Sequence, residues 1–158
     1  MIMKKNILFQ LVFLILFSIA FISLKAQTSS EQVRKGISET LQLWNTSATN
    51  ANVDQAMLLF DNSVNIMLIG SDSGEIFKGK DQIRGWLNQI FEYASFSWEM
   101  KRIDIDYNGK TAWVFVDGTM VVKIHKGGTI KKPYRFSGIM VKKNNVWKWR
   151  LFDGSEPK

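Results

Sequence analysis

The chain has 158 residues, of which 46% are hydrophobic, with no cysteine, one histidine and a formal net charge of +7. The lack of cysteine excludes disulfide bonds and thiol chemistry, and a single histidine, His125, excludes a metal site built on several imidazoles. The lysines are scattered rather than gathered in a basic stripe, so we expect no nucleic-acid partner. No glycine-rich loop opens a helix in the phosphate-binding form, and we expect neither a metal nor a cofactor.

The N-terminal segment has the three parts of a secretory signal peptide. Met1–Lys5 contains two lysines and no acidic residue, Leu11–Leu24 is apolar, and Ala26 precedes a polar stretch. The apolar run is shorter than the roughly 20 residues that span a bilayer as a permanent helix. We therefore expect a signal peptide over residues 1–26, a periplasmic or secreted protein, and no stable membrane insertion after cleavage. An uncleaved N-terminal anchor is the alternative. Residues 27–158 are expected to form one domain.

Three helices are expected in the first part of this domain. A capping box at Ser29–Gln32 precedes apolar residues at helical spacing, and the polar residues 45–50 then break the pattern. A second, short helix starts at Asn52, and a third starts near Gly79. The apolar positions that these helices are expected to bury are Val33, Ile37, Leu41, Trp44, Ala56, Leu59, Phe60, Ile83, Trp86, Leu87, Ile90 and Phe91.

Strands are expected in the remainder of the chain. Residues 64–69 and 75–78 are read as a strand and a short extended piece, joined by a turn over Gly70–Gly74. Four long strands follow, separated by turns at Asn108-Gly109, at Lys126–Thr129 and at Asn144-Asn145. Helices segregated to one side of an antiparallel sheet define the α+β class.

The apolar alternation changes phase inside the first of the long strands. Its apolar residues are even-numbered up to Met100 and odd-numbered from Ile103, which predicts a β-bulge that bends the sheet. Asp104 and Asp106 then point to solvent rather than forming a metal or acid–base pair. We expect a cone-shaped, bent antiparallel sheet with three helices packed in its concavity.

Several ordered motifs resemble those of SnoaL-like domains in the nuclear transport factor 2-like superfamily. The motifs are Gly70–Glu75, Phe77–Arg84, Thr111–Gly118, Arg135–Ser137 and Trp147–Ser155. The resemblance implies a cystatin-like roll and a shape similar to ketosteroid isomerase, scytalone dehydratase and polyketide cyclases. It also implies a homodimer formed through the outer face of the sheet. Related domains often carry a histidine where this chain has Asp153, so a role for that histidine does not transfer.

By the same resemblance, Arg135 and Asp153 stand on the strand faces that line an apolar cavity. There they would bind the polar ends of a ligand, with aromatic walls around it. The candidate walls are Trp44, Phe60, Trp86, Trp113 and Trp149, with Asp72 at the mouth. The alternative is a buried Arg–Asp pair that only closes the core.

Two functions are compatible with such a cavity. The first is capture of a small, partly apolar molecule. The second is cofactor-independent isomerisation, dehydration or cyclisation, with Asp153 or Asp117 as general base. Arg135 next to a carboxylate would lower its pKa and weaken it as a base, which favours binding.

Overall fold

The computed structural model describes residues 30–157, so the predicted signal peptide, residues 1–26, lies outside the described residues. The chain divides into two units, Met1–Gly36 and Ile37–Lys158. Residues 30–36 of the first unit are helical. The second unit holds the whole sheet. No helix within residues 30–157 has the length and the apolar composition needed to cross a membrane.

The helices of the second unit are residues 37–49, α2 (Val53–Leu58) and α3 (Gly79–Tyr93). α2 starts as predicted at Asn52, whose Oδ1 accepts the N–H of Gln55 at 2.9 Å. The first helix runs through the polar stretch that the pattern assigned to a break. In this stretch Asn45 is bonded to the sheet, because its Oδ1 accepts the N–H of Trp98 at 2.8 Å. The polar side chain therefore joins the helix to β3 (Ala94–Asn108) and does not end the helix.

Six strands form one sheet in the order β2-β1-β6-β5-β4-β3. The strands are β1 (Met67–Ile69), β2 (Ile76–Lys78), β3 (Ala94–Asn108), β4 (Thr111–Ile124), β5 (Thr129–Lys143) and β6 (Val146–Ser155). All pairs are antiparallel except β1–β6, which is parallel. The α+β class is confirmed, and the expected all-antiparallel sheet is corrected at this one pair.

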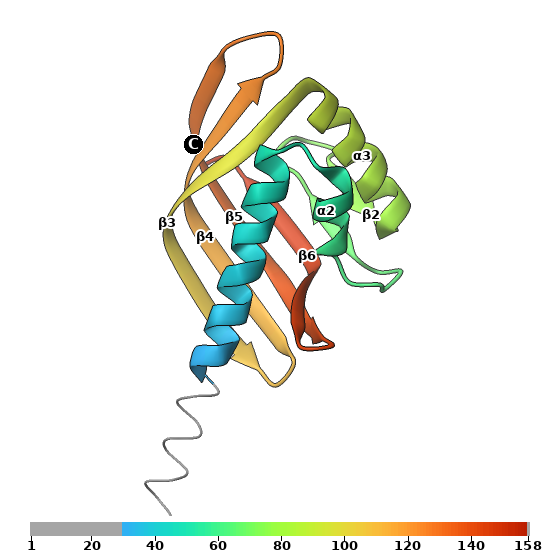
Figure 1. The fold of residues 1–158 in the computed structure, drawn as a ribbon, viewed down its shortest axis with the longest axis vertical. Coiled ribbons are helices and arrows are strands. Elements are labelled where there is room, and N and C mark those ends of the chain that lie inside the picture. The colour runs from blue at the N-terminus through green and yellow to red at the C-terminus, as the bar shows by residue number, and fades with distance from the viewer. Residues whose placement is uncertain (1–29, 158) are drawn as a thin grey trace, which may run out of the picture. The chain divides into compact units, whose positions relative to one another are not determined.

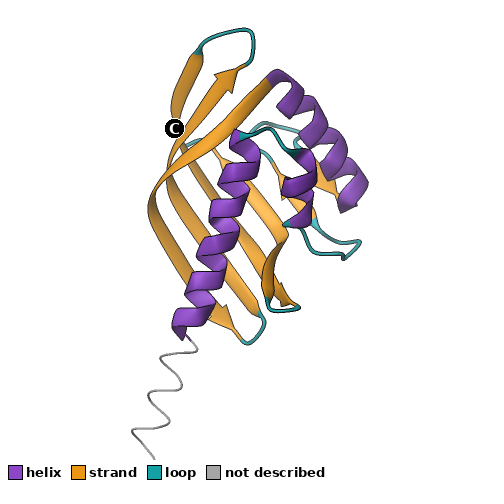
Figure 2. Ribbon diagram, viewed as in Figure 1, coloured by secondary structure: helices purple, strands orange, loops and turns teal. Residues whose placement is uncertain are grey.

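Within residues 37–157, the helices lie on one face of a curved sheet (Figures 1 and 2). This helix-covered face carries the core. On β5 its residues include the buried Tyr134, Phe136 and Met140. The opposite face, called the outer face below, carries Trp113 on β4 and Arg135 on β5. Alternate residues of a strand point to opposite faces, so each strand assigns its side chains by parity.

The predicted phase change in β3 is a β-bulge. The register of β3 against β4 shifts between Met100 and Arg102, which leaves Lys101 unpaired. Asp104 and Asp106 lie opposite Phe115 and Trp113 on the outer face, where both carboxylates are exposed as predicted. The phase slip in the sequence therefore located a real bend.

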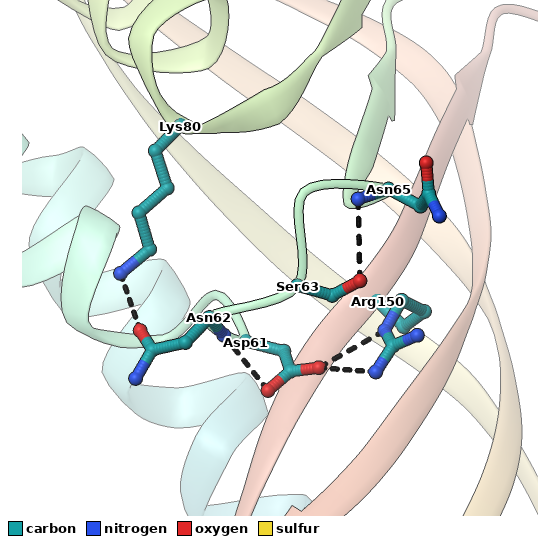
Figure 3. Close-up of polar contacts among 6 residues, drawn as sticks. All are labelled: Asp61, Asn62, Ser63, Asn65, Lys80 and Arg150. Carbon is teal, nitrogen blue, oxygen red and sulfur yellow. Dashed lines mark hydrogen bonds and ion pairs between the residues drawn. The ribbon is translucent and has the colours of Figure 1, made fainter.

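A second bulge lies in β6. Met140 pairs with Trp149 and Ile139 with Leu151, so Arg150 is the extra residue. The Arg150 guanidinium binds Asp61, which follows α2, with Arg150 Nε 3.0 Å from Asp61 Oδ2 (Figure 3). Beyond this residue the parity of β6 is reversed, so Phe152 and Gly154 face the helices and Asp153 does not.

Candidate functional site

A cavity of about 280 Å³ lies on the helix-covered face. It is bounded by the first helix, α3, the loop between β1 and β2, and strands β3 to β6. Its volume is near the lower end of the range for small-molecule sites. The residues that line it are Trp44, Gly70, Ser71, Asp72, Glu75, Trp86, Leu87, Ile90, Phe91, Tyr93, Phe96, Trp98, Met120, Val122, Ile124, Ile130, Lys132, Tyr134, Phe152 and Glu156.

Aromatic rings form the wall of the cavity nearest the core. Trp44 and Trp98 are stacked, with ring centroids 5.9 Å apart and an interplanar angle of 21°. Phe152 packs against Trp44 with centroids 5.2 Å apart. On the side of α3, Trp86 stacks on Phe77 at 5.1 Å. These contacts hold the ring planes in place, so the wall is preformed.

Two of these indoles have N–H groups without a partner. Nε1 of Trp44 and Nε1 of Trp98 are buried and make no hydrogen bond with any described residue. Nε1 of Trp149 shares this property but does not line the cavity. A buried donor without an acceptor loses its hydration free energy, so each of these N–H groups lowers the stability of the folded protein.

Glu75 supplies a carboxylate at the cavity. Its Oε2 accepts the N–H of Asp72 at 3.1 Å, and its Oε1 accepts Nε1–H of Trp86 at 3.3 Å. The side chain folds over Gly70, where a Cβ would lie 2.0 Å from Glu75 Oε2. A side chain at position 70 would therefore displace the Glu75 side chain. Sequence reasoning missed Glu75, because it treated the segment as a short extended piece; the glycine five positions earlier was the available signal.

Other polar residues of the lining are linked to one another. Ser71 Oγ donates to Glu156 Oε1 at 3.1 Å, and the Lys132 ammonium binds the same carboxylate. Burial raises the pKa of Tyr134, and the Glu75 carboxylate raises it further, against a smaller opposing effect of the Ser71 hydrogen bond. Tyr134 therefore stays protonated. This polar end, called the mouth below, consists of Ser71, Asp72, Glu75, Lys132, Tyr134 and Glu156.

Arg135 and Asp153 do not line the cavity, which corrects the expectation that they are its principal polar groups. Arg135 lies on the outer face, where its Nε is 2.8 Å from Oδ1 of Asp117, the residue opposite it on β4. Both side chains are well exposed, at 50% and 39%. The physical reason is that the apolar residues of β5 have the other parity, and the bulge at Arg150 turns Asp153 outward.

The predicted walls divide into two groups. Trp44 and Trp86 line the cavity, and Asp72 lies at its mouth. Phe60 and Trp149 are buried in the core beside it, so their assignment as walls is corrected. Trp113 is 48% exposed on the outer face and is likewise no wall, because Val114 and Val116 take the inward positions of β4.

The chain belongs to the SnoaL-like domain family. A sequence model of this family, described as SnoaL-like domain, matches residues 37–155. This span includes every strand and all but one residue of the cavity lining. No curated protein matches the chain.

Solved structures show the same fold. A protein of the nuclear transport factor 2-like superfamily from Salmonella enterica serovar Typhimurium matches with a TM-score of 0.71 and 19% identity, over 83% of this chain and 94% of that one. A proposed scytalone dehydratase from Novosphingobium aromaticivorans matches at 0.73 and 15%, over 83% and 89%. A proposed dehydratase from Streptomyces avermitilis matches at 0.70 and 10%, over 84% and 99%. At these identities the likeness establishes the fold.

Proposed function

We propose that the protein binds a small, largely apolar molecule in the cavity. One observation carries the proposal: a preformed cavity of about 280 Å³ has aromatic walls on the core side and its polar groups at one end. Apolar area supplies affinity in such sites, and a few placed polar groups supply orientation. Within residues 30–157 no group of three or more His, Cys, Asp or Glu is arranged to hold a metal ion.

The test compares a cavity-filling substitution with the same change on the outer face. Val122 lines the cavity on β4, whereas Ile139 on β5 is 39% exposed on the other side of the sheet. Binding of the uncharged dye N-phenyl-1-naphthylamine is followed by its fluorescence. We expect Val122→Trp to lose binding and Ile139→Trp to keep it. Equal binding by both variants would place the dye outside the cavity and contradict the proposal.

One observation favours a second candidate function, cofactor-independent proton transfer of the isomerase, dehydratase or cyclase type. Glu75 places a carboxylate at an apolar cavity, as a general base requires. It replaces Asp117 and Asp153 in that role, because neither lines the cavity. Two proteins of similar fold are named as proposed dehydratases. The test is to screen β-hydroxy ketones for dehydration: turnover lost in Glu75→Gln with dye binding kept supports catalysis, and turnover unchanged contradicts it.

We also propose export and pairing of two copies. Export rests on the basic, apolar and polar parts of residues 1–27. Mass spectrometry of protein recovered from cells tests export, since the expected mature chain starts at Gln27 and an intact N-terminus contradicts it.

Pairing of two copies rests on the exposed Trp113 and Ile139 on the outer face. Light scattering after size exclusion is expected to show a dimer in the wild type and a monomer in Trp113→Lys; a monomeric wild type contradicts it.

A further inference from the structure

We propose that a polar cleft at one end of the sheet binds a phosphate group, carried by a soluble molecule or by a lipid headgroup. The cleft lies between the β5–β6 turn and the segment that follows α2, and none of its residues lines the apolar cavity. The proposal is therefore independent of the function proposed above. The cleft has a volume of about 560 Å³, and its lining consists of Asp61, Asn62, Ser63, Lys143, Asn144, Val146, Lys148 and Arg150.

Positive charge is in excess in this cleft. Three lining side chains are cations, Lys143, Lys148 and Arg150, and one is a carboxylate, Asp61, which leaves a formal charge of +2. In the other ion pairs within residues 30–157, a single cation meets a single carboxylate. A phosphate monoester carries a charge between about −1.5 and −2 at pH 7, and it therefore matches the excess in the cleft.

The one carboxylate is already bound by the protein. Oδ1 of Asp61 accepts the N–H of Asn62 at 2.8 Å, and Oδ2 accepts two N–H groups of Arg150 (Figure 3). Burial raises the pKa of Asp61, but the Asn62 N–H, the Arg150 guanidinium and the Lys143 ammonium together lower it below its usual value. Asp61 thus stays ionised and orients the guanidinium. Since only 5% of its side chain is exposed, it presents little negative surface to the cleft.

The cations keep donors that Asp61 does not use. A guanidinium has five N–H groups, of which Asp61 accepts two, and 34% of the Arg150 side chain is exposed. The Lys148 ammonium has three N–H groups, of which one donates to the carbonyl of Leu58 at 3.0 Å. Lys143, at the end of β5, is exposed. An anion in the cleft can therefore accept from all three cations without breaking an existing bond.

Two neutral side chains add donors from the opposite side of the cleft. Oδ1 of Asn62 accepts Nζ–H of Lys80 at 2.5 Å, which leaves the amide N–H groups of Asn62 as donors. Oγ of Ser63 accepts the N–H of Asn65 at 3.2 Å and keeps its own hydrogen (Figure 3). Donors from two segments thus surround one volume. This arrangement suits the three terminal oxygens of a phosphate group better than the two of a carboxylate.

The test compares two small anions that share a polar body. Glycerol 3-phosphate carries the phosphate group and glycerate carries a carboxylate, and neither has an apolar part that fits the aromatic cavity. Affinities are measured by isothermal titration calorimetry at pH 7 and low ionic strength, because salt screens exposed charges. We expect glycerol 3-phosphate to bind about tenfold more tightly, since its second charge adds charge-assisted hydrogen bonds. Equal or tighter binding of glycerate overturns the proposal.

Three lysine variants assign this affinity to the cleft. Lys143→Gln and Lys148→Gln are each expected to weaken glycerol 3-phosphate about fivefold, because each removes a charged donor. Lys142→Gln is the matched control: it removes the same charge from the neighbouring residue of β5, which does not line the cleft, and should stay within about twofold of the wild type. All three should bind N-phenyl-1-naphthylamine as the wild type does. Equal weakening in all three would show general attraction to a basic protein and overturn the proposal.

Vesicles of phosphatidylcholine, with and without phosphatidic acid, identify the source of the phosphate group. A lipid headgroup is indicated if the protein sediments only with vesicles that contain phosphatidic acid, and if Lys143→Gln reduces this binding more than Lys142→Gln does. Binding of glycerol 3-phosphate without binding of vesicles indicates a soluble phosphate ester. If the protein binds neither glycerol 3-phosphate nor phosphatidic acid, the proposal is wrong, whereas dye binding in the apolar cavity is unaffected by that result.

Discussion

Arg150 and Asp61 form a largely buried ion pair that joins the bulge of β6 to the segment after α2. Only 5% of the Asp61 side chain is exposed, against 34% for Arg150. The backbone beside this ion pair is also hydrogen-bonded, because the N–H of Asp61 donates to the carbonyl of Trp149 at 2.9 Å. The ion pair therefore fixes Arg150, the bulge residue that reverses the parity of β6. With the parity reversed, Phe152 lies in the cavity wall and Asp153 lies on the outer face.

We expect Asp61→Asn to lower the free energy of unfolding by about 2 kcal/mol at pH 7, because it removes a charged acceptor from a partly buried guanidinium. Burial raises the pKa of Asp61, but the N–H of Asn62 and the Arg150 guanidinium more than offset this. The pKa of the folded protein therefore lies below the usual 3.8. The stabilisation is thus present above about pH 4 and is lost as the pH falls through the lowered pKa.

Urea denaturation at pH 7 and at pH 3 measures this effect. The difference between wild type and Asp61→Asn is expected to shrink on acidification. Asp54→Asn serves as the control, since Asp54 pairs with Arg84 but its side chain is 85% exposed, and it is expected to cost less than about 0.5 kcal/mol at either pH. Equal costs for the two substitutions would show that the Arg150 pair contributes no more than a surface pair.

Two glycines with equal space around them are expected to respond in opposite directions. A Cβ at Gly85 in α3, or at Gly74 in the loop before β2, would meet no atom within 4 Å. Gly74 has φ of +89°, a conformation that a side chain disfavours, and Gly85 does not. Thermal unfolding should show Gly85→Ala stabilised by about 0.5–1 kcal/mol and Gly74→Ala destabilised by about 1 kcal/mol. A shift of the same sign in both would contradict this account.

Gly154 and Tyr134 are expected to be energetically coupled. A Cβ at position 154 would lie 1.9 Å from the Tyr134 hydroxyl oxygen. Gly154→Ala should therefore cost about 2 kcal/mol in the wild type. In the Tyr134→Phe background the cost should fall by about 1 kcal/mol, because the obstructing oxygen is gone. A double-mutant cycle from denaturant curves gives this coupling, and additive costs would argue against the close approach.

Substitutions on the outer face are expected to leave the cavity unaffected. Arg135→Gln and Asp153→Asn should bind N-phenyl-1-naphthylamine within about twofold of the wild type, because neither residue lines the cavity. Loss of the exposed Arg135–Asp117 pair should cost less than about 1 kcal/mol of stability. A tenfold loss of dye affinity in either variant, with the fold intact, would show that the substituted residue contributes to the binding site.

Much of the fold could be predicted from local pattern. Helical spacing located α3, the Asn52 cap located α2, and the phase slip after Met100 located the bulge in β3. These features depend on each residue's near neighbours in the chain, and the physics of period, capping and turn chemistry acts at that range. Trp44 and Trp86 lie on apolar helix faces that the same spacing predicts, and both line the cavity.

The polar part of the site depended on contacts between distant segments. Trp147, Trp149, Leu151 and Asp153 alternate without interruption in the sequence, so no local signal marks Arg150 as an extra residue. The bulge arises because the backbone of Trp149 pairs with Leu59 and Asp61, and because Asp61 binds the Arg150 guanidinium. Likewise, the Glu75 carboxylate is held at the cavity by the hydrogen bond that it accepts from Trp86, a residue of α3. Which carboxylate faces the cavity was therefore decided by packing between separate elements, where a shift of one residue exchanges the inner and outer faces of a strand.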